Sequence, residues 1–452
     1  MPDLSIDFAG IKSPNPFWLA SAPPTNSGYQ VMKAYDAGWG GAVWKTLGMP
    51  TINVSSRYAA TNYRDTRISG FSNIELISDR PLEDNLREMR EVTKRFPNHA
   101  TIASLMVDTR EQWIDIIKMV EDAGANGIEL NFGCPHGMCE RGMGSAVGQD
   151  PKALKTIVEW VMDAASIPVI TKLSPNISHI TDPGIAAVEA KTDAISLINT
   201  IKSIVGIDLD SYAPYPVVDG KGTNGGYCGP AVKPIAMHML KELKKHPLIK
   251  DTPISGIGGI ENWRDVVEYI LLGATSVQVC TAAMHYGFGI VRGMEDGLKR
   301  FMSEKGYNTI YDFAGKALPN VMEWKDLNLK YDVKANINSD KCIGCDLCYI
   351  ACDDGAHQAI ALPTDGSRIP SIIEENCVGC NLCSLVCPVE ECITMVQKDD
   401  GTKHNTWQQL TDSEEIPCTW NDDRAGGKGH YVPEPIKALE SVRKDRSGAR
   451  AK

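Results

Sequence analysis

Two nearly identical cysteine runs in the C-terminal third of this 452-residue chain constrain its fold more than any other sequence feature. The first run spans residues 342–352, the second spans residues 377–387, and both read Cys-x2-Cys-x2-Cys-x3-Cys. Together they hold eight of the chain's 14 cysteines. The shared spacing, more than the number of thiols, indicates what this segment binds.

Three cysteines at intervals of three residues suit one face of an iron–sulfur cube, and bacterial two-cluster ferredoxins have this spacing. In those proteins three cysteines of one run bind one 4Fe–4S cluster, while the fourth crosses to the other cluster. The two predicted ligand sets are Cys342, Cys345, Cys348 and Cys387, and Cys377, Cys380, Cys383 and Cys352. Structural zinc is the alternative, but zinc sites use paired Cys-x2-Cys units separated by a longer loop. Asp353 replaces the usual proline after the first run, at a position that shapes a turn and supplies no ligand.

Charge and hydropathy disfavour two classes of partner. The net charge of −11 argues against nucleic acid, because proteins that bind phosphate backbones present a basic surface. No segment approaches the roughly 18 consecutive apolar residues that a membrane helix needs, and the N-terminus lacks the features of a secretory signal. We therefore expect a cytoplasmic protein with reduced thiols and no membrane partner. Cysteines outside the two runs are expected to be buried and inert, with Cys134 as the exception.

Upstream of the cysteine runs, short apolar segments alternate with segments of helical periodicity. The candidate strands are 17–21, 41–47, 101–106, 127–132, 168–173, 194–200, 253–258 and 276–281. The helical segments between them include 83–95, 111–123, 151–165, 183–190, 231–245, 261–272 and 289–303. Eight such units predict an α/β fold, the (β/α)8 TIM barrel. A doubly wound sheet is the competing fold, but it needs a glycine fingerprint after its first strand, where this chain has Ala22, Pro23 and Pro24.

These patterns divide the chain into three parts. Residues 1–325 form the predicted barrel, and residues 333–400 form the predicted ferredoxin-like domain with its two clusters. Residues 401–452 show little periodicity, and we expect them to form an irregular docking tail.

The predicted strand ends are the place to look for a site, because TIM barrels carry function at the C-terminal face. Polar or small residues end seven of the eight strands. They are Ser21, Lys45 with Thr46, Asn131, Lys172, Asn199 with Thr200, Gly258 with Gly259, and Cys280 with Thr281. So consistent a pattern predicts a lined pocket rather than ordinary solvation of strand ends.

The last two strand ends indicate what the pocket holds. Gly258-Gly259 and Cys280-Thr281 follow the seventh and eighth strands, where barrels bind phosphate through backbone N–H groups. Iron–sulfur clusters carry single electrons, so a barrel fused to them is expected to hold a flavin, which converts one-electron steps into hydride transfer. FMN fits, because it has one phosphate. Lys45 and Lys172 would then face the flavin N1–C2=O edge, although each could instead be a strand-end lysine in a salt bridge.

A thiol follows the fourth strand in Asn131-Phe-Gly-Cys134-Pro-His136, ahead of a glycine-rich segment that runs to residue 150. Reduction of an activated C=C bond needs hydride on one carbon and a proton on its neighbour. A thiol with the ordinary pKa of about 8.5 is protonated at neutral pH and can supply that proton. Cys134 is therefore the candidate acid, with an inert loop thiol as the alternative. His136 would tune it or cap the loop, and the glycines suit a closing lid.

Four side chains offer the hydrogen-bond donors and acceptors that a planar cyclic amide needs. They are Asn73, Asn131, Asn199 and Thr200.

At these residues the chain resembles the dihydropyrimidine dehydrogenase family, in particular its bacterial two-subunit type, and more distantly the dihydroorotate dehydrogenases. The similarity extends over about residues 5–400. Its strongest points are 131–138, 140–144, 148–150, 72–76, 172–176, Asn199 with Thr200, and the two cysteine runs.

The resemblance implies reduction of uracil or thymine to the 5,6-dihydropyrimidine, with hydride passing from FMN N5 to C6 and a proton from Cys134 to C5. The implied FMN contacts are Ser21, Lys45, Thr46, Lys172, Gly229, Gly258, Gly259, Cys280 and Thr281. The implied substrate contacts are Asn73, Asn131, Asn199 and Thr200. The family's usual serine before the active cysteine is Gly133 here, which removes a hydroxyl from the substrate pocket.

The resemblance also implies a hetero-oligomer, in which a separate FAD subunit takes electrons from NAD(P)H and passes them through the clusters to FMN. The chain agrees, because no G-x-G-x-x-G follows a predicted strand. Three alternatives stay open. The same barrel could act on dihydroorotate or on another cyclic enamide, or the chain could transfer electrons without any substrate chemistry.

Overall fold

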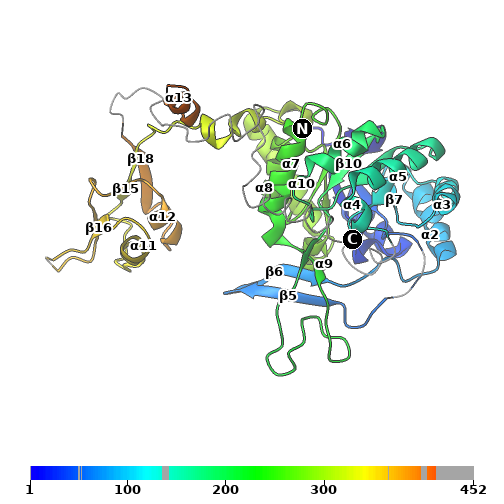
Figure 1. Ribbon diagram of the computed structural model, residues 1–452, viewed down its shortest axis with the longest axis horizontal. Helices are drawn as coiled ribbons and strands as arrows, with labels where there is room; N and C mark the ends of the chain where they lie inside the picture. The colour runs from blue at the N-terminus through cyan, green and yellow to red at the C-terminus, as the bar shows by residue number, and fades with distance from the viewer. Residues whose placement is uncertain are drawn as a thin grey trace, which may run out of the picture. The chain divides into compact units, whose positions relative to one another are not determined.

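A computed structural model of the chain describes residues 2–48, 51, 53–134, 142–364, 366–398 and 405–413. The chain divides into two compact units, Met1–Asn320 and Val321–Lys452 (Figure 1). The first contains the predicted barrel and the second contains both cysteine runs. Of the predicted tail, only 405–413 is described, and it includes the helix α13 (Trp407–Asp412). Within the described ranges no helix has the length and apolar character needed to cross a membrane.

The first unit is a closed barrel of eight parallel strands, each hydrogen-bonded to the next along the chain. They are β3 (Phe17–Leu19), β4 (Gly41–Val43), β7 (Ala100–Leu105), β8 (Gly127–Asn131), β9 (Val169–Lys172), β10 (Ala194–Leu197), β13 (Ile254–Ile257) and β14 (Ser276–Val279). The ring closes where Val279 of β14 pairs with Leu19 of β3. All eight predicted strands are confirmed, and so is the TIM-barrel architecture.

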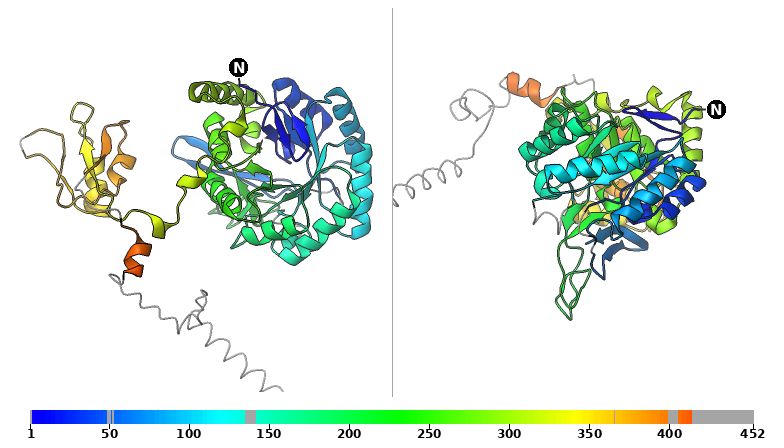
Figure 2. Two further views of the ribbon diagram at one scale, coloured as in Figure 1. Left: turned by 90° about the horizontal axis from the view of Figure 1, so that it is seen from above. Right: turned by 90° about the vertical axis from the view of Figure 1, so that its right-hand side faces the viewer.

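A layer of helices surrounds these strands (Figure 2, left). They are α1 (Gly28–Ala37), α2 (Leu82–Arg95), α3 (Arg110–Asp122), α5 (Pro151–Ala164), α6 (Thr181–Glu189), α7 (Lys233–Lys245), α8 (Trp263–Leu271) and α10 (Ile290–Lys305). Helix α3 shows why they form. Thr109 and Gln112 make a capping box, and Trp113, Ile116 and Val120 recur on one buried face. Helix α1 was absent from the sequence prediction, because its buried face is small.

A short hairpin lies at the end of the barrel where the strands begin. It consists of β1 (Ile6–Phe8) and β2 (Ile11–Ser13), and the Phe8 ring packs edge-on against the Trp18 ring at 5.3 Å. Gly127 starts β8 against it, and a Cβ there would lie 2.6 Å from Ile11 Cδ1. Side chains therefore fill this end of the barrel.

A second sheet lies beside the barrel and was not predicted from the sequence. It has the order β11-β12-β6-β5 and contains β5 (Tyr58–Tyr63), β6 (Thr66–Asn73), β11 (Ile201–Ser203) and β12 (Gly225–Cys228). The β5–β6 hairpin extends away from the barrel in Figure 1. Strand β5 is mostly exposed, and in β6 only Gly70 and Ser72 are buried, so the hairpin lacks the apolar alternation by which a half-buried strand is recognised. The sheet brings Phe71 and Asn73 to the barrel mouth.

The second unit is built around its thiols. Strand β15 (Val333–Ile337) pairs with β18 (Ile393–Gln397), and β16 (Ile360–Ala361) pairs with β17 (Ser371–Ile372). Helices α11 (Leu347–Gly355) and α12 (Leu382–Val386) each carry the later part of a cysteine run. The buried set combines Cys348, Cys352, Cys377, Cys383 and Cys392 with a few small or branched apolar residues. Cysteine thus takes much of the place that leucine or phenylalanine has in an ordinary core.

Candidate functional site

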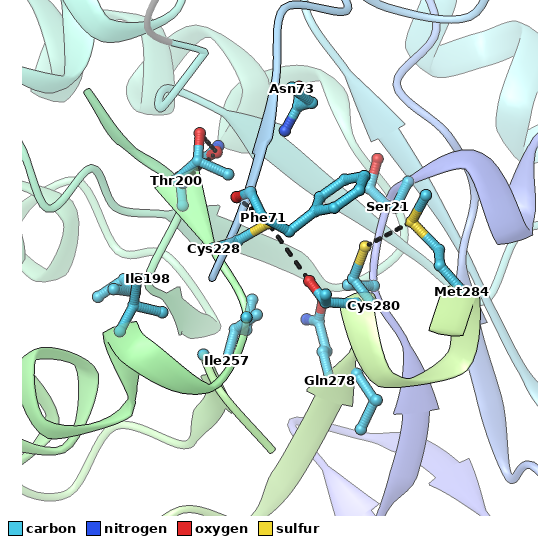
Figure 3. A pocket seen from close by; sticks show the side chains of 18 of the residues that line it. Ser21, Phe71, Asn73, Ile198, Thr200, Cys228, Ile257, Gln278, Cys280 and Met284 are labelled. Atoms are coloured by element: carbon cyan, nitrogen blue, oxygen red, sulfur yellow. Dashed lines mark hydrogen bonds between the residues drawn. The ribbon is translucent and has the colours of Figure 1, made fainter. Parts of the chain in front are cut away.

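A cavity of about 1110 Å³ opens at the C-terminal ends of the barrel strands (Figure 3). It brings together every barrel residue that the sequence assigned to the pocket. These are Ser21, Lys45, Thr46, Asn73, Asn131, Cys134, Lys172, Asn199, Thr200, Gly229, Gly258, Gly259, Cys280 and Thr281. Parallel strands deliver their ends to one face, so residues 260 positions apart in sequence meet around one space. The individual roles of these residues stay predictions.

Lys172, at the end of β9, is fixed by a buried carboxylate. Its Nζ lies 3.1 Å from Glu129 Oε1, and the side chains are 7% and 0% exposed. Glu129 Oε2 also accepts hydrogen bonds from Ser196 Oγ at 2.8 Å and from Gln278 Nε2 at 3.0 Å. A buried charge needs such partners, because an unpaired one is very costly. Sequence reasoning missed Glu129, although a single carboxylate inside an apolar strand was a usable signal.

Lys45, which also lines the cavity, is paired with a buried carboxylate in the same manner. Its Nζ donates to Glu75 Oε2 at 2.7 Å, and Glu75 Oε1 accepts from Tyr58 Oη at 2.6 Å and from Arg57 Nη1 at 3.0 Å. Burial by itself would raise the pKa of Glu75, but Lys45, Tyr58 and Arg57 hold it below its ordinary value. Both cavity lysines are therefore salt-bridged, as one of the two sequence interpretations expected, and both line the pocket. Their contact with a flavin stays a prediction.

Cys134 is buried at the edge of the cavity, beside Ile77, Met106 and Met143. Its carbonyl accepts a hydrogen bond from Ser145 N at 3.0 Å. Gly144, with φ of 57°, packs against it, and a Cβ there would lie 3.1 Å from Cys134 Cβ. Glycine therefore lets the following segment fold back over the thiol. Residues 135–141, including His136, lie outside the described residues.

The amide side chains form a linked row. Asn131 Nδ2 donates to Thr46 Oγ1 at 3.0 Å, and Asn131 Oδ1 accepts from Asn199 Nδ2 at 2.9 Å. Asn199 Oδ1 in turn accepts from Thr200 N at 2.7 Å. Gly133 lies against this row, and a Cβ there would be 2.3 Å from Asn199 Cβ. A side chain at position 133 would therefore require Asn199 to shift.

Three glycines form another part of the cavity wall. Gly229, Gly258 and Gly259 have φ of 89°, 133° and 66°, which L-residues with side chains rarely adopt. A Cβ on Gly258 would lie 2.8 Å from Ala236 Cβ, and one on Gly259 would lie 2.6 Å from Lys233 Cβ. The bare backbone at these positions makes a cradle in which N–H groups can approach a ligand closely.

Two further thiols face this side of the cavity. Thr281 Oγ1 donates to Cys228 Sγ at 3.3 Å, and Cys280 Sγ lies 3.7 Å from Met284 Sδ (Figure 3). Burial raises the pKa of Cys228 to about 11 and raises that of Cys280 as well. Both are therefore neutral thiols at physiological pH, and neither has the character of an activated nucleophile.

The second unit contains two smaller cavities, of about 350 and 340 Å³. The first is lined by Cys352, Cys377, Cys380 and Cys383. The second is lined by Cys342, Cys345, Cys348 and Cys387. The fourth cysteine of each run has crossed to the cavity of the other run, as the spacing predicts. Cys345 and Cys380 are exposed, so each cavity reaches the surface at the second cysteine of the run that supplies three of its thiols.

Two family profiles match the chain. The dihydroorotate dehydrogenase family matches residues 3–302, which is the barrel unit. The 4Fe-4S dicluster domain matches residues 335–395, which contains both thiol cavities.

Curated relatives combine the same regions. The chain is 43% identical over 359 residues to the NAD-dependent dihydropyrimidine dehydrogenase subunit PreA of Escherichia coli strain K12, covering 79% of this chain and 87% of that protein. It is 42% identical over 339 residues to the chloroplastic dihydropyrimidine dehydrogenase (NADP(+)) of Arabidopsis thaliana, with 72% and 79% covered. It is 35% identical over 323 residues to the catalytic subunit of dihydroorotate dehydrogenase B (NAD(+)) of Pyrococcus abyssi, with 70% and 99% covered.

Proposed function

Because this chain belongs to the dihydroorotate dehydrogenase family and carries a 4Fe–4S dicluster domain, we propose that it is the catalytic subunit of a dihydropyrimidine dehydrogenase. The chain is an oxidoreductase, and relatives named dihydropyrimidine dehydrogenase are 42–43% identical to it over most of its length. The observation that carries the proposal is the barrel-mouth cavity, in which a thiol, a row of amides and two lysines, each paired with a glutamate, surround one space. We infer that this space takes a flavin and uracil or thymine together.

The cavity fits a flavin, and FMN in particular. The glycine cradle at Gly229, Gly258 and Gly259 suits the single phosphate of FMN, while Ser21, Thr46, Cys280 and Thr281 contribute to the walls. Lys172 and Lys45 supply positive charge for the N1–C2=O edge of the ring. When bound, FMN supplies reversible exchange of two electrons and a proton as hydride.

One buried atom supports this fit independently. Gln278 Oε1 has no hydrogen-bond partner among the described residues, although its amide nitrogen is bound to Glu129. Glu129 also holds Lys172, and both Gln278 and Lys172 line the cavity. The flavin edge presents N3–H next to C2=O, a donor beside an acceptor. A buried acceptor without a partner in the protein alone is a feature that a ligand can satisfy.

The amide row is the proposed contact surface for the pyrimidine. Asn73, Asn131, Asn199 and Thr200 offer donors and acceptors to a ring that alternates N–H and C=O groups. Asn131 is fixed between Thr46 and Asn199, so it can hold the ring without first adopting a new rotamer. Cys134 would then hold a proton for C5 of the ring, on the opposite face from the flavin.

Electrons reach this site from elsewhere, and the two thiol cavities are the proposed route. Each cavity is lined by the four cysteines of one predicted ligand set, the number of thiolates that a 4Fe–4S cluster needs, and Cys392 lines one of the two cavities in addition. The Escherichia coli relative is named as a subunit, so we propose a hetero-oligomer in which an FAD subunit oxidises NAD(P)H and reduces the clusters.

Dihydroorotate is the competing substrate, since a dihydroorotate dehydrogenase subunit is 35% identical to the chain. Orotate differs from uracil by a carboxylate, which calls for a cation. Lys45 and Lys172 pair with Glu75 and Glu129 and are assigned here to the flavin edge, so neither is left to pair with a substrate carboxylate. This pairing favours the uncharged pyrimidine.

The test uses the full chain purified anaerobically and reduced with dithionite, which replaces the partner subunit. Addition of uracil is expected to reoxidise the flavin and to form dihydrouracil, while orotate at the same concentration reoxidises it much more slowly. A clear preference for orotate would overturn the substrate assignment. A purified chain that binds no flavin would overturn the enzyme assignment.

A further inference from the structure

Glu129 of β8 joins four strands of the barrel through its two carboxylate oxygens. Oε1 accepts from Lys172 Nζ of β9 at 3.1 Å, while Oε2 accepts from Ser196 Oγ of β10 at 2.8 Å and from Gln278 Nε2 of β14 at 3.0 Å. Both Glu129 and Ser196 are fully buried. Lys172 and Gln278 line the barrel-mouth cavity. One buried carboxylate therefore fixes a cation and an amide that both border the ligand space.

This carboxylate also decides which end of the Gln278 amide a ligand can meet. An ionised carboxylate only accepts hydrogen bonds, so the end of the amide that contacts Glu129 is the NH2 group. The carbonyl oxygen, Oε1, is left at the other end, and it has no hydrogen-bond partner among the described residues. Gln278 is 1% exposed and belongs to the pocket drawn in Figure 3, so bulk water contributes little to satisfying this oxygen. A buried acceptor at a cavity is a position that a ligand N–H can fill.

The other cavity lysine offers a matched comparison. Lys45 Nζ donates to Glu75 Oε2 at 2.7 Å, and Glu75 Oε1 accepts from Arg57 Nη1 at 3.0 Å. Both carboxylates thus pair with a lysine that lines the cavity, but the Gln278 amide is hydrogen-bonded to Glu129. The two sites share the ion pair and differ in the amide. Their comparison separates the effect of charge from the effect of amide orientation.

We propose that Glu129 is a positioning residue for the flavin, which turns the Gln278 amide so that its Oε1 accepts from N3–H of the ring and which lowers the flavin reduction potential. The inference rests on the flavin part of the proposed function. An ammonium group and an amide oxygen together fit a ligand edge that carries an acceptor beside an N–H donor, and the C2=O and N3–H groups of the ring form such an edge. Reduction adds negative charge to the N1–C2=O region, and the carboxylate offsets the positive field of Lys172 there. Gln278 is thus a flavin contact that sequence reasoning missed.

The first test measures the flavin potential and needs no pyrimidine. The full chain loaded with FMN is titrated anaerobically against a reference dye, with the clusters followed separately by electron paramagnetic resonance. Glu129→Gln removes the negative charge and keeps the size of the side chain. At a fixed potential, its ratio of reduced to oxidised flavin should rise about tenfold, which is about 30 mV for a two-electron couple. Glu75→Gln should shift the potential in the same direction.

The second test examines the Gln278 contact. The full chain, freed of flavin, is titrated with FMN and with FMN methylated at N3, and binding is followed by flavin fluorescence. The unmodified chain should bind the methylated compound about tenfold more weakly, because the methyl group removes the donor and leaves a buried acceptor without a partner. Gln278→Leu should bind FMN more weakly and lose much of this discrimination. Glu129→Gln should lose part of it, since an amide at 129 no longer dictates which end of Gln278 meets the ligand, whereas Glu75→Gln should retain it.

Four results would overturn the inference. They are equal binding of the two compounds by the unmodified chain, unchanged discrimination in Gln278→Leu, an unchanged potential in Glu129→Gln, or weaker binding of uracil but not of FMN in Gln278→Leu, which would place the amide at the pyrimidine. Gln278→Leu removes no buried charge, so it keeps the test decisive if Glu129→Gln fails to fold.

These readouts are distinct from those of the proposed function. A chain that discriminates between the two flavins as expected but does not reduce uracil leaves this inference standing and removes the proposed substrate chemistry. A chain that reduces uracil but binds both flavins equally does the reverse. A chain that takes up no FMN removes both.

Discussion

The barrel mouth and the cysteine-rich second unit, here called the thiol domain, are both predicted cofactor sites. They differ in whether the side chains of the site already have partners within the protein. In the barrel mouth, Lys45, Lys172 and Asn131 already have protein partners, and the barrel around them has a large aromatic and aliphatic core. In the thiol domain, the prospective ligands are themselves much of the buried core.

This difference shows two relations between a fold and its cofactor. The barrel supplies its own stability, so a flavin adds to it only through ordinary binding linkage. The thiol domain has few apolar residues to bury, and burial raises the pKa of Cys348 and raises that of Cys383 to about 11. Iron would have to replace those protons, so we expect cluster binding and folding of this domain to be coupled.

The largest expected effect tests this contrast directly. Anaerobic chelation of iron should unfold the thiol domain and leave the barrel folded, because only the former uses metal ligands as its core. Hydrogen exchange measured by mass spectrometry should show loss of protection in β15 and β18 and none in β7 to β9. Persistent protection of β15 and β18 in iron-free protein would break the comparison.

Next in size is the loss of the proposed proton donor. Cys134→Ala should lower uracil reduction by about 10²- to 10⁴-fold, the usual contribution of a general acid, while flavin and iron contents stay unchanged. Single-turnover reoxidation of the reduced protein measures it. Cys228→Ala is the matched control, since it removes another thiol from the same cavity. Near-normal turnover in Cys134→Ala would rule out the acid role.

The third prediction concerns the preformed ion pair under the barrel mouth. Glu129→Leu leaves Lys172 buried without its carboxylate and should destabilise the barrel by about 3–5 kcal/mol, measured by denaturant unfolding. Glu189→Gln breaks the exposed pair between Glu189 and Lys155, whose side chains are 52% and 39% exposed, and should leave the free energy of unfolding nearly unchanged. Equal effects in the two variants would show that Glu129 does not hold Lys172 as described.

The smallest expected effect sharpens the account of the substrate pocket. Gly133→Ala adds a methyl group that would overlap Asn199. The variant should have a higher KM for uracil and be destabilised by about 1–3 kcal/mol through overpacking. Gly293→Ala is the control, because that exposed helical glycine has nothing within 4 Å and the change should be neutral or slightly stabilising. An unchanged KM in Gly133→Ala would mean that Asn199 does not contact the substrate from this position.

Much of both regions could be predicted from local pattern. The eight barrel strands are apolar runs of the right length, and the cysteine spacing predicts which cysteines line each of the two thiol cavities. The sheet that carries Phe71 and Asn73 could not be found in this way, because β5 is mostly exposed and neither β5 nor β6 buries alternate apolar residues. Glu75 and Glu129 were missed as well, since each acts through a partner about 30–43 positions away in the chain.

The sequence by itself therefore determined the number and order of the barrel strands, the residues at their ends and the crossing of the fourth cysteine in each run. Periodicity and spacing are local properties, and a single chain displays them directly. Only the tertiary structure decided that Lys45 and Lys172 are salt-bridged, that a side chain at 133 would crowd Asn199, and that Cys392 lines one thiol cavity. Each of these depends on which distant side chains meet when the barrel closes or the thiol domain folds, and pairing between distant residues leaves no periodic trace along the chain.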